Sequence, residues 1–152
     1  KMWPIENFIK LANRLQANFL NIKFVLLGET KHEHRISNDF KIDIKDKESV
    51  INLCGKSRIE ELPILINDLD LLLTNDTGTM HMAIALQTNT ISLFGPTESE
   101  VFGPYQDSHL HQVIQVDGSI ANNLPKKQRG QEGMALISVD NVFDKLNEFL
   151  DV

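Results

Sequence analysis

Two short runs of residues, at 70–74 and 90–94, constrain the fold most strongly. Neither run alternates apolar with polar side chains, so each is predicted to be a strand buried on both faces. Strands of this kind are typical of parallel sheets that helices cover on both sides. The rest of the chain supports this interpretation, because predicted strands and helices alternate along it. We therefore expect an α/β fold, a parallel sheet with helices on both faces.

The other expected elements follow from periodicity, capping patterns and turn residues. Ser57 and Glu60 form a capping box, so a helix is expected to begin at Ser57 and to kink at Pro63. Thr97 and Glu100 form a second capping box. Further strands are expected at 22–27, 50–53 and 111–116, helices at about 4–20, 29–39, 79–86 and 140–150, and a surface loop at 117–133.

Composition narrows the class of protein. The chain has 152 residues, of which 41% are apolar, enough for one soluble domain with a core. Its formal charge of -6 excludes nucleic-acid binding by bulk charge, so an anionic ligand needs a local binding site that supplies hydrogen-bond donors or positive charge. Cys54 is the single cysteine, and no signal peptide or apolar run of membrane-spanning length is present, so we expect a cytoplasmic location. The abrupt opening at Lys1 is expected of a piece of a longer protein.

The turn Asp76-Thr77-Gly78 lies between the strand at 70–74 and a helix expected to begin near Thr79. In parallel α/β folds, ligands bind beyond the carboxyl ends of the strands. Gly78 allows close backbone approach and positive φ, and free amides at a helix start attract an anion. A phosphate fits there, whereas the Asp76 carboxylate suits hydrogen bonds from sugar hydroxyls. The alternative is that Asp76 or Thr77 only caps the helix.

Two neighbouring features favour a ligand at this turn. Thr97 has a glutamate three residues later, whereas Thr77 has none, so the amides after Thr77 stay available. His81 lies four residues past Thr77 on the same helical face, near enough to donate to a ligand oxygen. A histidine in this position is more often structural when it stands alone.

Other clusters of polar residues are weaker candidates. The segments 32–34 and 109–111 each carry two histidines, but neighbouring residues rarely converge on one ion, so no metal site is expected. The basic segment 126–129 is expected to be a solvated loop, with contact to an acceptor or to a membrane surface as the alternative. The sequence contains neither Gly-x-Gly-x-x-Gly nor a Walker loop, which argues against simple dinucleotide binding and ATP hydrolysis.

Taken together and in order, several segments resemble glycosyltransferase family 9, the lipopolysaccharide heptosyltransferases. They are Lys1-Met2-Trp3-Pro4, Val25-Leu26-Leu27-Gly28, Asn75-Asp76-Thr77-Gly78-Thr79-Met80-His81, Leu93-Phe94-Gly95-Pro96-Thr97, and Gly133-Met134-Ala135-Leu136-Ile137 followed by Val142. The resemblance covers nearly the whole chain. It implies a Rossmann-like fold, the C-terminal half of a GT-B glycosyltransferase. Residues 1–152 are then the donor-binding domain, and the N-terminal acceptor domain is absent from this chain.

The resemblance also implies roles for individual residues. Lys1 is expected to reach the donor phosphates, and Thr77 with the Gly78 amide to cradle the diphosphate. Asp76 is expected to engage the donor sugar, with His81 supporting the same motif.

Three further positions are implied less directly. Glu29 is expected to contact a ribose hydroxyl, with Glu33 as its competitor, and Gly55-Lys56-Ser57 to lie near the base. Thr97 is expected to face the cleft. Many relatives carry cysteines in the segment matching 118–134, and their absence here weakens assignment to a subfamily or to one donor sugar.

The implied activity is transfer of heptose from ADP-heptose to the lipopolysaccharide inner core, with inversion and without a metal or other cofactor. The general base is expected in the N-terminal domain, so this chain contains no catalytic residue and is expected to bind the donor without transferring it. The acceptor is reached through that domain, at the cytoplasmic face of the inner membrane. The alternatives are a nucleotide-sugar epimerase domain and a non-catalytic nucleotide-sugar binding module.

Overall fold

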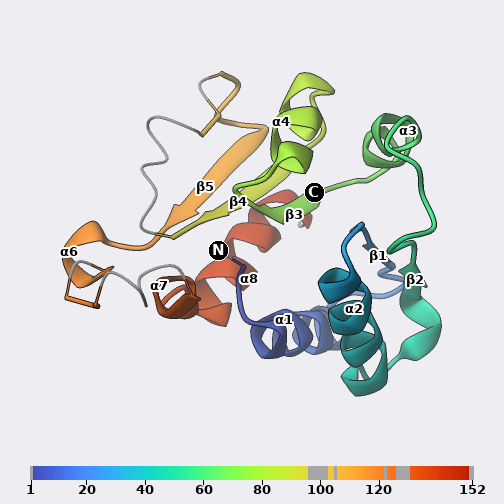
Figure 1. Cartoon of the computed structure of the whole chain (residues 1–152), viewed down its shortest axis with the longest axis horizontal. Helices are drawn as coiled ribbons and strands as arrows, with labels where there is room; N and C mark the ends of the chain where they lie inside the picture. The colour runs from blue at the N-terminus through green and yellow to red at the C-terminus, as the bar shows by residue number, and fades with distance from the viewer. Residues whose placement is uncertain (1, 96–102, 105, 122, 126–130, 151–152) are drawn as a thin grey trace. The chain divides into compact units, whose positions relative to one another are not determined.

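The computed structural model describes residues 2–95, 103–104, 106–121, 123–125 and 131–150, which divide into two compact units (Figure 1). One unit comprises residues 5–62. The other comprises residues 1–4 and 63–152, so the start of the chain belongs to the same unit as its end. The helix α3, Leu62–Asn67, begins at the boundary between the units.

The unit of residues 5–62 is a pair of parallel strands packed with two helices. Its elements are α1 (Ile5–Asn18), β1 (Phe24–Leu26), α2 (Lys31–Asp43), a 3-10 turn (Lys47–Ser49) and β2 (Val50–Asn52). The strands pair in register, with Phe24 opposite Val50. The buried core consists of Ala12, Phe40, Ile44 and Val50. The rings of Phe24 and Phe40 pack edge to face beside it, with 6.3 Å between their centroids. This packing positions the loops that follow β1 and β2.

The larger unit is built on a three-stranded parallel sheet of order β3-β4-β5. The strands are β3 (Leu72–Asn75), β4 (Thr90–Phe94) and β5 (His111–Gln115), and the helices are α4 (Gly78–Ala85), α6 (Gly118–Ala121), α7 (Gln131–Ala135) and α8 (Val139–Leu150). All five residues of the central strand β4 are buried, so both faces of the sheet are covered. The helix α8 packs through Val142, Phe143 and Leu146.

The structure confirms the predicted fold class, parallel α/β with the expected alternation of strands and helices. The strands at 70–74 and 90–94 are β3 and β4. The hydrogen-bonded ladders form two sheets, one in each unit. The segment 117–133, which we expected to be a loop, carries the short helix α6 and the start of α7.

The predicted helix start at Ser57 is wrong. Residues 58–61 form a turn in which the Glu61 carboxylate accepts a hydrogen bond from the Arg58 amide at 2.8 Å. The helix α3 begins only at Leu62, which places Pro63 in its first turn. No amide donor is needed there, so Pro63 starts the helix and does not kink it. The second predicted capping box, Thr97 with Glu100, lies outside the described residues.

Candidate functional site

The turn between β3 and α4 leaves the start of α4 uncapped. Thr77 is the N-cap residue, with extended backbone (φ −146°, ψ 169°), and its side chain makes no cap hydrogen bond to a described residue. The Thr77 carbonyl accepts from the Met80 amide at 3.1 Å. The first amides of a helix have no acceptor within the helix, so those of Gly78 and Thr79 are free to bind a ligand.

The start of α2 shows the opposite arrangement. The Thr30 hydroxyl accepts from the Glu33 amide at 3.2 Å, and the Glu33 carboxylate accepts from the amides of Thr30 and Glu29 at 2.8 and 3.0 Å. Burial raises the pKa of the Glu33 carboxyl, but these hydrogen bonds outweigh burial and hold its pKa below its ordinary value. The side chains at the start of α2 therefore accept hydrogen bonds from its first amides, whereas no described side chain does so at the start of α4.

The Thr77 hydroxyl faces a neighbouring threonine. Its oxygen lies 3.3 Å from the Thr74 hydroxyl oxygen, and Thr74 donates to the Asn75 carbonyl at 3.0 Å. A hydroxyl has one proton to donate, so Thr77 is the donor within the pair. Thr74 is buried whereas Thr77 is exposed, so this hydrogen bond joins the core to a surface hydroxyl.

Gly78 is not required by the packing of the described residues. A Cβ built on Gly78 meets no described heavy atom within 4 Å, whereas one at Gly28 comes within 2.8 Å of Glu33 Cβ and one at Gly95 within 3.0 Å of Met134 Sδ. The turn does not use the positive φ that a glycine allows at position 78, since Gly55 is the glycine with positive φ within the described segments. The space beside the Gly78 backbone is therefore open within the described residues.

The beginning of the chain is joined to the same turn. Asn75, the last residue of β3, accepts a hydrogen bond from the Trp3 amide at 3.0 Å through Oδ1. The Trp3 ring is fully buried, and its Nε1 donates to the Ile137 carbonyl at 2.9 Å. Residues 2–4 are thereby fixed beside the residue that precedes Asp76.

The structure brings four of the predicted site residues together. Asp76, Thr77 and Gly78 are consecutive, and His81 follows on α4, where its side chain is exposed. Glu29 lies in the other unit, after β1, and is exposed. Lys1 and Thr97 lie outside the described residues, so their predicted roles stay predictions.

Sequence reasoning missed Thr74 and Asn75. The first was assigned only to the strand, and the second only to the family motif. The Trp3 contact with Asn75 joins residues 72 positions apart, so no local pattern could reveal it. The Thr30–Glu33 capping box, in contrast, was visible as threonine followed three residues later by glutamate.

The histidine segments contribute no cluster of metal ligands. No group of three His, Cys, Asp or Glu side chains within the described residues could hold an ion. His111 is buried, and its Nδ1 instead shares a hydrogen bond with the Thr90 hydroxyl. Burial lowers the pKa of His111, the Asp107 charge opposes this effect, and His109 adds to it.

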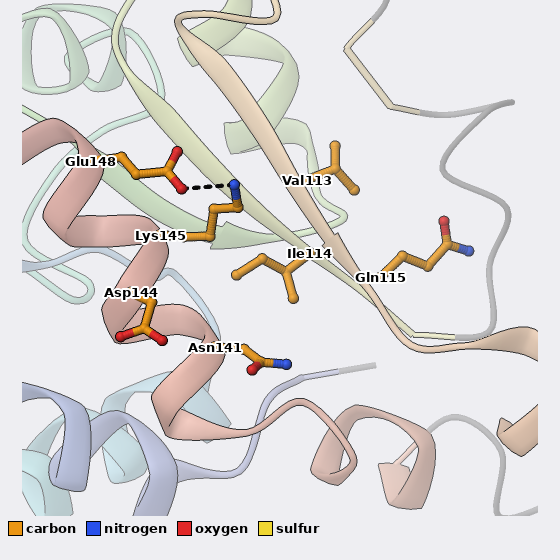
Figure 2. Close-up of a pocket in the computed structure, with 7 residues that line it drawn as sticks. All are labelled: Val113, Ile114, Gln115, Asn141, Asp144, Lys145 and Glu148. Atoms are coloured by element: carbon orange, nitrogen blue, oxygen red, sulfur yellow. Dashed lines mark hydrogen bonds and ion pairs between the residues drawn. The ribbon is translucent and has the colours of Figure 1, made fainter.

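A shallow pocket lies elsewhere, between β5 and α8 (Figure 2). The Lys145–Glu148 ion pair at 2.9 Å lies on its α8 side, and none of the predicted site residues lines the pocket. Among the helices of the described residues, none is both long and apolar enough to cross a membrane.

The parallel strands and the helices between them define an α/β fold. A model of the family described as "Glycosyltransferase family 9 (heptosyltransferase)" matches residues 1–131, and the chain belongs to this family. Lipooligosaccharide heptosyltransferase 2 of Haemophilus influenzae is 28% identical over 99% of this chain and 43% of its own length. The same enzyme of Campylobacter jejuni is 32% identical over 74% of this chain and 35% of its own length.

Solved structures agree with this fold. The structure of E. coli ADP-heptose lps heptosyltransferase II has a TM-score of 0.77 and 24% identity, over 99% of this chain and 43% of that one. A glycosyltransferase family 9 structure from Veillonella parvula has a TM-score of 0.77 and 24% identity, over 100% of this chain and 43% of that one. The likeness confirms the predicted Rossmann-like fold of the C-terminal half of a GT-B enzyme. The chain spans less than half the length of these relatives.

Proposed function

We propose that this chain is the donor-binding domain of an inverting glycosyltransferase that transfers heptose from ADP-heptose to the lipopolysaccharide inner core. Its curated relatives carry heptosyltransferase names, among them Lipopolysaccharide heptosyltransferase 2 of Escherichia coli, 30% identical over 76% of this chain. E. coli heptosyltransferase WaaC, with a TM-score of 0.78 and 19% identity, was solved with ADP, and again with ADP-2-deoxy-2-fluoro heptose. Family membership disfavours the epimerase alternative.

The uncapped start of α4 is the observation that carries the proposal. A diphosphate seated there accepts hydrogen bonds from the Gly78 and Thr79 amides and from the Thr77 hydroxyl. The open space at Gly78 lets phosphate oxygens approach the backbone. The half-buried Asp76 then accepts from sugar hydroxyls beside the diphosphate, and His81 donates to a ligand oxygen from the next turn of α4.

The remaining predicted residues keep the roles that the resemblance implies, as part of the proposal. The roles we propose are a positive charge from Lys1 for the diphosphate, a hydrogen bond from a ribose hydroxyl to Glu29, and a donor contact for Thr97; Lys1 and Thr97 lie outside the described residues. Glu33 is the weaker candidate for the ribose, because its carboxylate already accepts from the start of α2. The backbone of 55–57 contacts the base.

In the proposed reaction, an acceptor hydroxyl forms a new bond to the anomeric carbon of the donor. The bond from that carbon to the diphosphate breaks, and ADP leaves with the electron pair. The hydroxyl proton passes to a general base in the N-terminal domain. Helix amides and Lys1 stabilise the charge that develops on the diphosphate. We place the reaction in the cytoplasm, at the inner face of the inner membrane.

Calorimetry tests donor binding by the chain alone. We expect weak binding of ADP and ADP-heptose, and weaker binding of UDP-sugars. Absence of ADP binding, or tighter binding of UDP, contradicts the donor assignment. A transfer assay separates enzyme from binding module: the chain alone is expected to release no ADP from ADP-heptose with a lipopolysaccharide acceptor, and the longer protein with its N-terminal domain is expected to do so.

A further inference from the structure

Thr74 is a buried threonine three residues before the cap of α4. It lies in β3, is 8% exposed, and donates to the Asn75 carbonyl at 3.0 Å. That hydrogen bond already gives its buried hydroxyl a partner. The same hydroxyl oxygen also lies 3.3 Å from the hydroxyl oxygen of Thr77. This second contact constrains Thr77, which is the exposed residue of the pair.

The contact holds the Thr77 side chain away from its own helix. A threonine at a helix cap commonly accepts from the second or third helical amide, which here belong to Thr79 and Met80. Thr77 accepts from neither within the described residues. Its hydroxyl donates to Thr74 instead, since Thr74 gives its own proton to the Asn75 carbonyl.

The start of α2 lacks such a neighbour and is capped. Its cap residue, Thr30, has Leu27 three residues before it. The Thr30 hydroxyl accepts from the Glu33 amide at 3.2 Å, the usual capping hydrogen bond. Both cap residues are threonines with extended backbone, so the backbone at the cap does not explain the difference. A hydroxyl three residues before the cap is present at α4 and absent at α2.

The direction of the hydrogen bond between the two threonines is reversible. A hydroxyl carries one proton, accepts through two lone pairs, and turns about its C–O bond. Once Thr77 donates to a ligand oxygen, the Thr74 proton is free to turn from the Asn75 carbonyl to the Thr77 oxygen. The pair then stays hydrogen bonded across the same 3.3 Å, and no proton leaves either residue.

We propose that Thr74 is a positioning residue that acts through Thr77. It keeps the Thr77 hydroxyl off the helix amides before the donor binds, so the amides and the hydroxyl are all available to the diphosphate. It then donates to Thr77 while Thr77 donates to a phosphate oxygen, and hydrogen bonds in such a chain strengthen one another. Thr74 itself does not touch the donor. The inference rests on the proposed function, because it assumes that a diphosphate binds at the start of α4.

A double-mutant cycle tests this inference on the whole chain. Calorimetry measures ADP affinity for wild type, Thr74→Val, Thr77→Val and the double variant, with adenosine as the ligand that lacks phosphate. Thr74→Ser, which keeps the hydroxyl, is the rescue variant. Thr88→Val is the matched control, because Thr88 lies in the same unit, is 7% exposed, and donates to the Ile66 carbonyl at 3.2 Å. Thermal unfolding followed by circular dichroism reports the fold of each variant.

Thr74→Val is expected to weaken ADP binding about threefold to tenfold, the effect of one hydrogen bond. In the Thr77→Val background it is expected to have no further effect, because the residue through which it acts has lost its hydroxyl. Thr74→Ser and Thr88→Val are expected to bind ADP as wild type does, and adenosine binding to stay unchanged in every variant. If Thr74→Val does not fold, Thr74→Ala replaces it and is compared with Thr74→Ser, from which it differs only by the hydroxyl.

Three results overturn the inference while leaving the proposed function intact. These are an unaltered ADP affinity in Thr74→Val, an equal loss with and without the Thr77 hydroxyl, or an equal loss for adenosine. The two equal losses indicate that Thr74 only supports the fold. If the wild-type chain fails to bind ADP at all, the proposed function itself is wrong and the inference falls with it.

Discussion

The hydroxyl oxygens of Thr74 and Thr77 lie 3.3 Å apart at the point where β3 ends and the turn into α4 begins. Thr74 gives its proton to the Asn75 carbonyl, so the Thr77 hydroxyl is turned toward Thr74 and away from the first amides of its own helix. This contact explains why a residue that commonly caps helices leaves the amides of α4 free. A bound phosphate competes with Thr74 for the Thr77 proton.

Replacing Thr77 with valine is expected to weaken ADP binding by roughly 1.5 to 3 kcal/mol, the range for a hydrogen bond to a charged group. Thr77→Ser keeps the hydroxyl and is expected to bind within a few tenths of a kcal/mol of wild type. Calorimetry with ADP measures both. An unchanged affinity in a folded Thr77→Val protein means that Thr77 serves only as the end of the turn.

The substitution Gly78→Ala is expected to weaken ADP binding without lowering the stability of the fold. The added methyl enters open space at the first residue of α4, so the free energy of unfolding is expected to stay the same or rise by up to about 1 kcal/mol. The same methyl blocks the approach of phosphate oxygens, and ADP binding is expected to fall at least tenfold.

Gly118→Ala is the matched control for Gly78→Ala. Gly118 is also the first residue of a helix, α6, and a Cβ built there also meets no described heavy atom within 4 Å. Its stability is expected to change as that of Gly78→Ala does, with ADP affinity unaltered. Wild-type affinity in Gly78→Ala shows that phosphate does not approach this backbone.

Stability is expected to fall in acid as Glu33 is protonated. The pKa of Glu33 is held below its ordinary value, so its stabilising contribution is complete above about pH 4.3 and is lost as pH falls toward the folded value. Thermal unfolding followed by circular dichroism at pH 7 and pH 3.5 measures the change. Glu33→Gln is expected to lose less stability between these values than the control Glu60→Gln does. Equal losses contradict the role given to the α2 capping box.

His111 is expected to make stability depend on pH in a higher range. Burial lowers the pKa of His111, so the unfolded chain takes up this proton more readily than the folded chain. The contribution of the neutral ring is complete above about pH 6.5 and is lost as pH falls below it. The unfolding temperature is expected to fall between pH 7.5 and 5.5, and to fall less in His111→Gln. The exposed His109→Gln is the control, and an equal fall in both variants contradicts the assignment.

Local sequence patterns predicted the elements that local physics determines. The strand at 90–94 was predicted to be buried because it lacks alternation, and β4 covers those residues and is buried throughout. The start of α4 was predicted near Thr79, and the helix begins at Gly78.

Patterns failed where one local signal competed with another. The capping motif at Ser57 predicted a helix start, but the Glu61 carboxylate accepts a hydrogen bond from the Arg58 amide and a turn forms there instead. The short helices after β5 carry too few periodic residues to be distinguished from a loop. The Trp3–Asn75 hydrogen bond joins residues 72 positions apart, so it forms only when the unit folds, and no local pattern indicates it.

The central claim is that a diphosphate binds at the start of α4. Amide NMR spectra of the chain, titrated with ADP, AMP and adenosine, test it most directly. The account predicts that the Gly78 and Thr79 amide resonances shift strongly with ADP, less with AMP, and little with adenosine. Resonances of these two amides that stay in place while ADP binds elsewhere on the chain contradict it.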